Sequence, residues 1–311
     1  MRKEKIYTLP CLYRDDMDIY GFRFGKGEKA ACIVGAIRGN EVQQLYICSQ
    51  LVKKLKELEI NGAIVHDKEI LVIPSVNHSS MNIEKRFWAT DNTDINRMFP
   101  GYDQGETTQR IAAGLFKEIQ DYSFGIQFPS FYMPGDFVPH VRMMDTGFQN
   151  PSLANLFGMP YVIIRKPRPI DTATLNYNWQ IWETNAFSIY TCETARIDEE
   201  SARMAVASVL RFLTRMGILR YTSHGGYIAS VVKEDSMYNV KNTVPGIFRR
   251  LAEPGVEVRR GDVLAEITDP LEGDVIGRVL SPTDGIIFFA YKKPIVMEQA
   301  IVFKIIRRLH E

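Results

Sequence analysis

The chain has 311 residues, in which 38 Lys and Arg side chains stand against 37 Asp and Glu side chains. This length is sufficient for two domains, or for one large domain with an appendage. The balanced charge argues against a nucleic-acid-binding protein and against a partner that is an acidic polymer.

The sequence shows no targeting or membrane-spanning segment. Its first residues, Met1 to Lys5, are charged and lead into no apolar stretch of the signal-peptide type. No segment approaches the roughly 18 consecutive apolar residues of a membrane span. The four cysteines are scattered, so a buried thiol is the simplest interpretation of Cys32 and Cys48. We therefore expect a cytoplasmic protein without membrane contact.

The first two thirds of the chain alternate between strand-like and helical patterns. Short apolar runs predict strands, and apolar residues that recur every three or four positions predict helices. In chain order the predicted elements are a strand at 31–34, a helix at 41–58, a strand at 70–73, a helix at 107–120, a strand at 161–165 and a helix at 199–216. This alternation is typical of an α/β domain with a mostly parallel or mixed sheet.

A long loop follows the strand at 70–73. We expect Pro74 to end that strand and the loop to continue through Gly105. Loops of this length inside compact domains are usually either functional or disordered. Aromatic residues such as Trp88 and Phe99 argue against disorder. The loop is therefore a candidate functional segment.

The pattern changes after about Tyr221. Short β-type runs separated by Gly, Pro and Asp follow at 244–248, 254–258, 261–267 and 281–287. This spacing predicts a small β-barrel or sandwich. We therefore divide the chain into an α/β domain at 1–221 and a β-domain at 222–311.

The C-terminal runs resemble the barrel-sandwich fold of lipoyl and biotinyl carriers. Such a carrier needs a modifiable Lys at an exposed hairpin tip. The corresponding hairpin, residues 269–274, contains no Lys. We therefore interpret this domain as structural, since fold likeness alone does not establish a carrier role.

Two segments of the α/β domain carry a family resemblance. The turn after the first predicted strand reads Arg38-Gly39-Asn40-Glu41, and residues 93–101 read Thr-Asp-Ile-Asn-Arg-Met-Phe-Pro-Gly. With His at position 38, the turn would be the metal-binding signature of the succinylglutamate desuccinylase/aspartoacylase family, and the second segment closely matches that family's Asp-x-Asn-Arg-x-Phe-Pro-Gly motif. The chain resembles this family over most of its length. The resemblance implies a zinc-carboxypeptidase-like mixed sheet flanked by helices, with a C-terminal β-domain.

The resemblance also implies a zinc site, and this chain departs from it. A monozinc hydrolase uses three protein ligands and one open position. Glu41 is the one family ligand retained, whereas Arg38 and Gln127 stand where the family has His. A guanidinium offers no lone pair, and an amide oxygen is a poor zinc ligand. We expect Arg38 to occupy the metal position, with Glu41 and Glu193 as its counter-charges, and we expect no cofactor.

Other family roles fall on polar residues of this chain. Asn96 and Arg97 would hold the substrate carboxylate, because an Arg fork suits bidentate binding. Arg86 would polarise the scissile carbonyl, and Glu193 would be the general base. The residues that we place in the substrate-binding cleft are Asn96, Arg97, Arg38, Gln127 and His140. The expected ligand is a small anion of the N-acyl amino acid or dicarboxylate type.

Three functions remain open. The first is a metal-dependent hydrolase of an N-acyl amino acid or related amide, which would hold zinc at a substitute site made of Glu41, His140 and Glu193. The second, which we favour, is a non-catalytic or metal-independent descendant of this family that binds a small anion without zinc. The third is a partner-binding protein that uses the β-domain and the aromatic segment 177–182. The sequence leaves open the oligomeric state and whether hydrolysis is retained.

Overall fold

The computed structural model describes residues 1–12, 15–222 and 225–308. The chain divides into two compact units. The first unit comprises Met1–Ser130, His140–Tyr190 and Thr194–Val231, and the second comprises Phe131–Pro139, Thr191–Glu193 and Val232–Glu311. The C-terminal part of the second unit thus begins at Val232, whereas the sequence placed the boundary at residue 222. Two short segments from earlier in the chain also belong to the second unit, which a change in composition cannot reveal.

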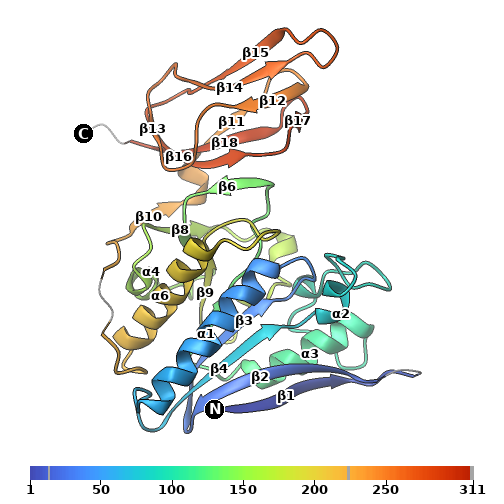
Figure 1. Ribbon diagram of the computed structural model, residues 1–311, viewed down its shortest axis with the longest axis vertical. Coiled ribbons are helices and arrows are strands. Elements are labelled where there is room, and N and C mark those ends of the chain that lie inside the picture. The colour runs from blue at the N-terminus through green and yellow to red at the C-terminus, as the bar shows by residue number, and fades with distance from the viewer. Residues whose placement is uncertain (13–14, 223–224, 309–311) are drawn as a thin grey trace. The chain divides into compact units, whose positions relative to one another are not determined.

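A mixed sheet runs through the first unit in the order β1-β2-β4-β3-β5-β9-β7-β8-β10 (Figure 1). Its strands are β1 (Arg2–Leu9), β2 (Met17–Gly25), β3 (Glu28–Ala36), β4 (Lys68–Ser75), β5 (Phe124–Gln127), β7 (His140–Met144), β8 (Tyr161–Arg165), β9 (Asn185–Tyr190) and β10 (Ser230–Lys233). Strands β4, β3, β5 and β9 are parallel to one another. Antiparallel pairs join β1 to β2, β2 to β4, and β7 to β9. The predicted α/β domain with a mixed sheet is therefore confirmed.

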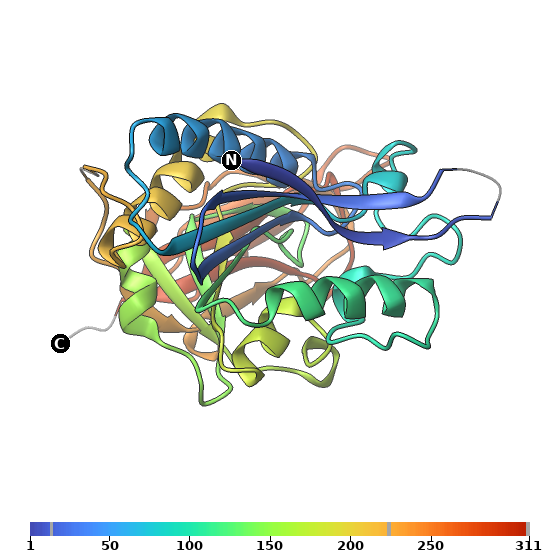
Figure 2. The ribbon, with the colours of Figure 1, turned by 90° about the horizontal axis from the view of Figure 1, so that it is seen from below.

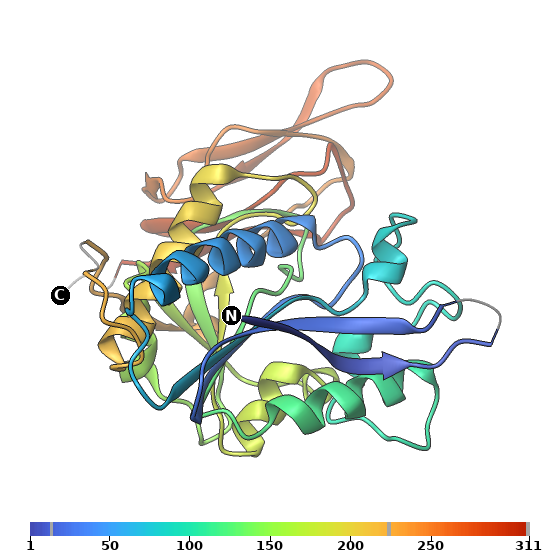
Figure 3. The ribbon, with the colours of Figure 1, turned by 60° about the horizontal axis from the view of Figure 1, so that its bottom comes forward.

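Helices cover both faces of this sheet. Figure 2 shows α1 (Val42–Ile60) and α3 (Thr107–Ile119) on opposite sides of the strands, and Figure 3 shows α1 beside α6 (Glu199–Arg215). The alternation of side chains along β3 explains this arrangement, because successive strand residues face opposite sides. Ala31 and Ile33 pack in one core cluster with residues of α1 and α6, whereas Cys32 and Val34 pack in another with residues of α3 and α5 (Leu175–Ile181).

Shorter helical segments lie in the connections. They are α2 (His78–Met81), η1 (Ile95–Arg97), α4 (Pro151–Ala154), η2 (Asn155–Phe157), η3 (Pro169–Asp171) and η4 (Glu234–Ser236). The long loop after β4 contains α2 and η1, and it contributes the buried side chains of Trp88 and Phe99 to the core. No helix in the described part of the chain is long and apolar enough to cross a membrane.

The predicted elements of the first unit differ from the observed ones mainly at their ends. The helices predicted at 107–120 and 199–216 are each observed one residue shorter, and the strand at 161–165 is observed with those bounds. The prediction that Pro74 ends its strand is wrong. Strand β4 continues to Ser75, because Ser75 still pairs with Ala36 in the parallel register of β3 and β4.

The second unit is built of antiparallel strands. One sheet contains β11 (Tyr238–Lys241), β18 (Ile301–Arg307), β16 (Gly285–Tyr291) and β13 (Glu257–Val258), with β6 (Gly135–Phe137) paired to β16. The other contains β15 (Val275–Leu280), β14 (Val263–Thr268), β12 (Gly246–Arg250) and β17 (Ile295–Val296). Apolar side chains of both sheets, such as Phe248 and Phe303, share one core cluster. Two sheets around a common core form a sandwich, which confirms the predicted all-β fold.

Candidate functional site

The candidate site residues of the first unit follow the ends of its parallel strands. Because β3, β4 and β5 are parallel, their carboxyl ends lie at the same edge of the sheet. The turn containing Arg38 and Glu41 follows β3, the long loop follows β4, and Gln127 is the last residue of β5. Gln127 is buried and pairs in register with Val34 of β3 and Ser188 of β9. The sheet topology therefore gathers segments that are distant in sequence.

Arg38 is buried at this edge between two carboxylates. Its Nε donates to both oxygens of Asp94 at 3.1 Å, and its Nη2 donates to Asp94 Oδ2 at 2.8 Å. Its Nη1 donates to Glu41 Oε1 at 3.2 Å and to Ser130 Oγ at 3.1 Å. Burial alone would lower the pKa of Arg38, but the charges of Glu41 and Asp94 and the hydrogen bonds to them outweigh burial and raise it. The guanidinium is therefore permanently charged and engaged within the protein.

Hydrogen bonds occupy both carboxylate oxygens of Glu41. Oε2 accepts from the backbone N–H groups of Ile37 at 2.9 Å and Arg38 at 3.0 Å. Oε1 accepts from the backbone N–H of Ser130 at 3.1 Å and from Arg38 Nη1. Each oxygen thus has two donors, which matches the roughly two acceptor sites of a carboxylate oxygen. A metal ion could bind Glu41, which is 1% exposed, only by displacing one of these donors.

The residues at this edge do not fit a zinc ion. Arg38 cannot ligate a metal, and Glu41 already accepts four hydrogen bonds. Gln127 presents an amide, whose Nε2 donates to Asn96 Oδ1 at 3.4 Å. Zinc sites in proteins use imidazole, thiolate or carboxylate ligands. Within residues 1–12, 15–222 and 225–308, no three His, Cys, Asp or Glu side chains are grouped so that they could hold a metal ion.

Asn96 is held by the protein through its side-chain oxygen. Oδ1 of Asn96 accepts from the backbone N–H of Leu175 at 3.3 Å as well as from Gln127. Its own backbone N–H donates to Asp94 Oδ1 at 3.1 Å, so Asp94 also caps the helical turn η1. The structure thus brings together Asn96 and Gln127, two of the predicted cleft residues.

Arg97 is anchored on one side. Its Nη1 donates to the carbonyl of Ile170 at 2.6 Å and to Asp171 Oδ1 at 3.1 Å. The other oxygen of Asp171 accepts from Arg165 Nη2, also at 3.1 Å. The Asp171 side chain is 4% exposed, whereas that of Arg97 is 28% exposed. Arg97 is therefore fixed through one nitrogen and keeps part of its surface open to solvent.

Arg86 is an exposed cation at the same edge. Its backbone carbonyl accepts from the N–H of Gly39 at 2.9 Å, which ties the long loop to the turn after β3. The protein around Arg86 removes part of its hydration and so lowers its pKa, and the charge of Arg38 lowers it further. Its guanidinium lies 5.2 Å from the centroid of the Phe87 ring. In the described part of the chain, Arg86 has no carboxylate partner of the kind that Arg38 and Arg97 have.

His140 and Glu193 have other surroundings. His140 begins β7, is fully buried, and stacks on the ring of Tyr190 with 4.9 Å between the centroids. Glu193 belongs to the second unit, where its Oε1 accepts from Lys292 Nζ at 2.7 Å. The sequence analysis expected Glu193 to be the second counter-charge of Arg38. That role of Glu193 stays a prediction, and the structure shows Asp94 as a second carboxylate paired with Arg38.

Sequence reasoning did not single out Asp94, Ser130 or Lys292. Asp94 had a usable signal, because it lies inside the family-like segment 93–101 and a buried Arg38 requires nearby carboxylates. Ser130 and Lys292 carry no comparable local signal. Their contacts depend on how distant segments fold together.

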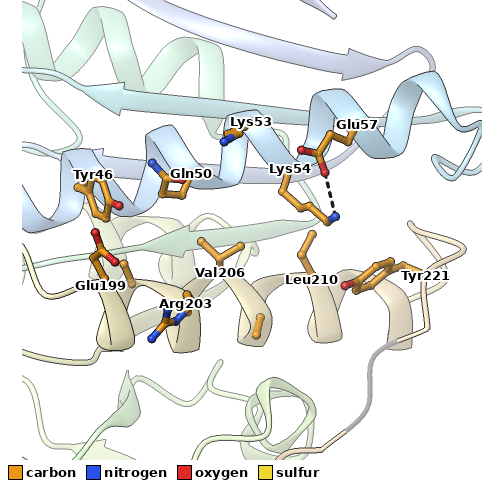
Figure 4. Close-up of a pocket in the computed structure, with 12 residues that line it drawn as sticks. Tyr46, Gln50, Lys53, Lys54, Glu57, Glu199, Arg203, Val206, Leu210 and Tyr221 are labelled. Carbon is orange, nitrogen blue, oxygen red and sulfur yellow. Dashed lines mark hydrogen bonds and ion pairs between the residues drawn. The ribbon is translucent and has the colours of Figure 1, made fainter.

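A cavity of about 510 Å³ lies between α1 and α6 (Figure 4). None of the candidate site residues described above lines it. Its lining carries both signs of charge, including Lys53 from α1 and Glu199 from α6, and Lys54 is already paired with Glu57 at 2.9 Å. We therefore do not assign this cavity to the candidate site.

We compared the chain with a family model and with curated proteins. The family model of the succinylglutamate desuccinylase/aspartoacylase catalytic domain matches residues 28–216, which run from the start of β3 to just past α6. None of the curated proteins matches the chain.

Several solved structures resemble the whole chain. A succinylglutamate desuccinylase/aspartoacylase from Rhodobacter sphaeroides is 20% identical, with a TM-score of 0.78 over 99% of this chain and 96% of that one. A succinylglutamate desuccinylase from a Silicibacter species is 17% identical, with a TM-score of 0.80 over 98% and 94%. The product-bound ectoine utilization protein EutE from Ruegeria pomeroyi is 17% identical, with a TM-score of 0.76 over 93% and 89%. At these identities the structures show the fold alone. Because the family model covers more than half of the residues, the chain belongs to the succinylglutamate desuccinylase/aspartoacylase family.

Proposed function

We propose that this chain binds a small carboxylate-bearing ligand, of the N-acyl amino acid or dicarboxylate type, without a zinc ion. The observation that carries the proposal is the buried Arg38 guanidinium between Asp94 and Glu41. A fixed positive charge there compensates buried carboxylates, as a metal ion would. It cannot accept an electron pair, so it supplies no Lewis-acid chemistry.

The charges that remain available favour an anionic ligand. Arg38 is engaged within the protein, whereas Arg86 is exposed and Arg97 is anchored through one nitrogen only. A guanidinium can bind a carboxylate with two parallel hydrogen bonds. The family name refers to acylated or succinylated acidic amino acids, which is consistent with this ligand class.

Any hydrolytic activity of this chain would depend on residues outside the turn that contains Arg38 and Glu41. Arg38, Glu41 and Gln127 do not supply a metal-bound water, so we assign no hydrolytic step to them. Glu193 stays a candidate general base, since its side chain is 25% exposed and is paired with Lys292. Arg86 likewise stays a candidate for polarising a bound carbonyl.

For the second unit we propose a structural role. The hairpin at residues 269–274 joins β14 to β15 and contains no Lys that could carry a cofactor. A cytoplasmic location is also part of the proposal. All four cysteines are free, as expected of a reducing compartment.

Calorimetric titration of EDTA-treated protein with succinate and with N-acetylaspartate tests the proposal. We expect at least one of the two to bind with 1:1 stoichiometry, and we expect added zinc to leave the affinity unchanged. Binding or hydrolysis that appears only after zinc is added would overturn it.

A further inference from the structure

Helix α6 contributes to a second cavity in the first unit. This cavity has a volume of about 180 Å³ and is lined by Ser208 and Arg211 of α6, by the segment 157–160 before β8, and by Gly225, Gly226 and Tyr227. Ser208 and Arg211 are three residues apart, so they project from the same face of the helix. The cavity is not lined by Arg38, Glu41 or Asp94.

The cavity is shaped around the side chain of Arg211. A Cβ atom at Gly158 would lie 2.8 Å from Arg211 Nε, and one at Gly226 would lie 2.8 Å from Cζ and Nη1. Both glycines have positive φ angles, +72° and +112°, which other residues rarely adopt. The N–H of Tyr227 donates to the carbonyl of Gly158 at 2.9 Å, which joins the two loops beside the arginine. Glycine at both positions thus leaves the space that the guanidinium occupies.

Two buried side-chain atoms of the residues that line this cavity lack a hydrogen-bond partner in the described part of the chain. Nε of Arg211 and Oγ of Ser208 are both buried and make no hydrogen bond there. Ser208 is only 5% exposed. Arg38 and Arg97 in the same unit are each paired with an aspartate, whereas no described carboxylate pairs with Arg211. Because a buried polar or charged group without a partner costs free energy, this arrangement is suited to an anionic ligand.

The walls of the cavity indicate the kind of anion. Phe157, Met159, Pro160 and Met204 line it with apolar surface. A volume of about 180 Å³ suits a ligand of roughly six non-hydrogen atoms, taking about 30 Å³ for one water molecule in the liquid. An apolar wall stabilises an alkyl chain and gives nothing to inorganic phosphate, which is hydrated on all sides. We propose that this cavity binds a short-chain monocarboxylate such as butyrate, with Arg211 and Ser208 donating to its carboxylate.

Titration of the full-length protein with butyrate, followed by calorimetry, tests this proposal. Saturable binding to the wild type is expected, and Arg211→Gln should weaken it about tenfold or more, since a charge-assisted hydrogen bond is lost. Ser208→Ala should weaken it less, because a neutral hydroxyl is lost. Arg215→Gln, which changes an exposed arginine of the same helix, is the matched control and should bind butyrate as the wild type does.

Other outcomes would overturn the proposal. The first is that the wild type shows no saturable binding of butyrate. The second is that the Ser208→Ala and Arg211→Gln proteins both bind butyrate with the affinity of the wild type. The third is that the cavity binds phosphate and not butyrate. Circular dichroism would check that each variant is folded. If the Arg211→Gln protein is not folded, the butyrate affinity of the Ser208→Ala protein tests the proposal. The Arg211→Gln protein should still bind the ligand of the Arg86 and Arg97 edge. This inference and the proposed function can therefore fail separately.

Discussion

Arg38 and Asp94 form a bidentate ion pair, in which Nε and Nη2 of the guanidinium donate to the carboxylate at 3.1 Å and 2.8 Å. The pair connects the turn after β3 to the loop after β4, 56 residues later in the chain. Asp94 also caps the turn η1, which carries Asn96 and Arg97. The position of the family-like segment 93–101 is therefore coupled to Arg38.

Replacing Asp94 with Asn should destabilise the protein. The variant keeps the size of the side chain but removes the charge that compensates the buried Arg38, and breaking a buried ion pair costs about 3 kcal/mol or more. Urea unfolding followed by fluorescence measures the change. Asp103→Asn alters an exposed carboxylate of the same loop and serves as the control. An Asp94→Asn protein as stable as the control would show that the pair contributes little.

The stability of the protein should depend on the forked shape of the Arg38 guanidinium as well as on its charge. Arg38→Lys keeps the positive charge but loses the fork that bonds Asp94 on two nitrogens, so we expect a loss of about 1–3 kcal/mol. Arg38→Met leaves the buried Glu41 and the partly buried Asp94 without their cation, so we expect a larger loss of about 3–5 kcal/mol. Urea unfolding of both variants gives the order of stability. A Met variant at least as stable as the Lys variant would contradict a stabilising role for the positive charge at position 38.

Arg86 should contribute to ligand affinity without contributing to stability. Arg86→Gln removes an exposed guanidinium, and the loss of a charge-assisted hydrogen bond should weaken binding of an anionic ligand by about 1.5–3 kcal/mol. Titration calorimetry with succinate or N-acetylaspartate, whichever binds the wild type, gives the change in affinity. Lys85→Gln removes the neighbouring exposed charge and controls for general electrostatic attraction. Equal losses in the two variants would argue against a direct contact by Arg86.

His78 should make the stability depend on pH. Burial lowers the pKa of this side chain below its ordinary value of 6.5, and the charge of Asp18 offsets only part of that shift. The unfolded chain therefore binds a proton more tightly than the folded one, and stability should fall as the pH drops from 6.5 through the folded-state pKa. Urea unfolding over this range should show the fall in the wild type.

The His78→Gln protein should lack this part of the fall, because glutamine does not titrate. His66→Gln, which replaces a histidine whose side chain is 90% exposed, is the control and should behave like the wild type. Parallel stability curves for the wild type and His78→Gln would contradict the prediction.

The sequence predicted most of the fold because its strong signals are local. Apolar periodicity identified the helices at 107–120 and 199–216, and short runs between turn residues identified the β-domain. The strand end at Pro74 was misplaced, because the pairing of Ser75 with Ala36 depends on a strand that is distant in sequence. The β6 strand of the second unit was missed for the same reason, since its partner is β16.

The candidate site was predictable only in its residue types. The family resemblance predicts that Arg38 and Gln127 stand where the family has His, and Glu41 was expected beside Arg38. The sequence did not indicate the ion pair between Arg38 and Asp94 or the hydrogen bond from the Ser130 backbone to Glu41, because both depend on tertiary contacts between distant segments.

The central claim is that Arg38 takes the place of zinc in this chain. Elemental analysis of purified protein, incubated with zinc and then dialysed, tests it most directly. We predict zinc far below one equivalent per chain, with no difference between the wild type and Glu41→Gln. About one zinc per wild-type chain, lost in the Glu41→Gln protein, would show that Glu41 takes part in a zinc site and would contradict the claim.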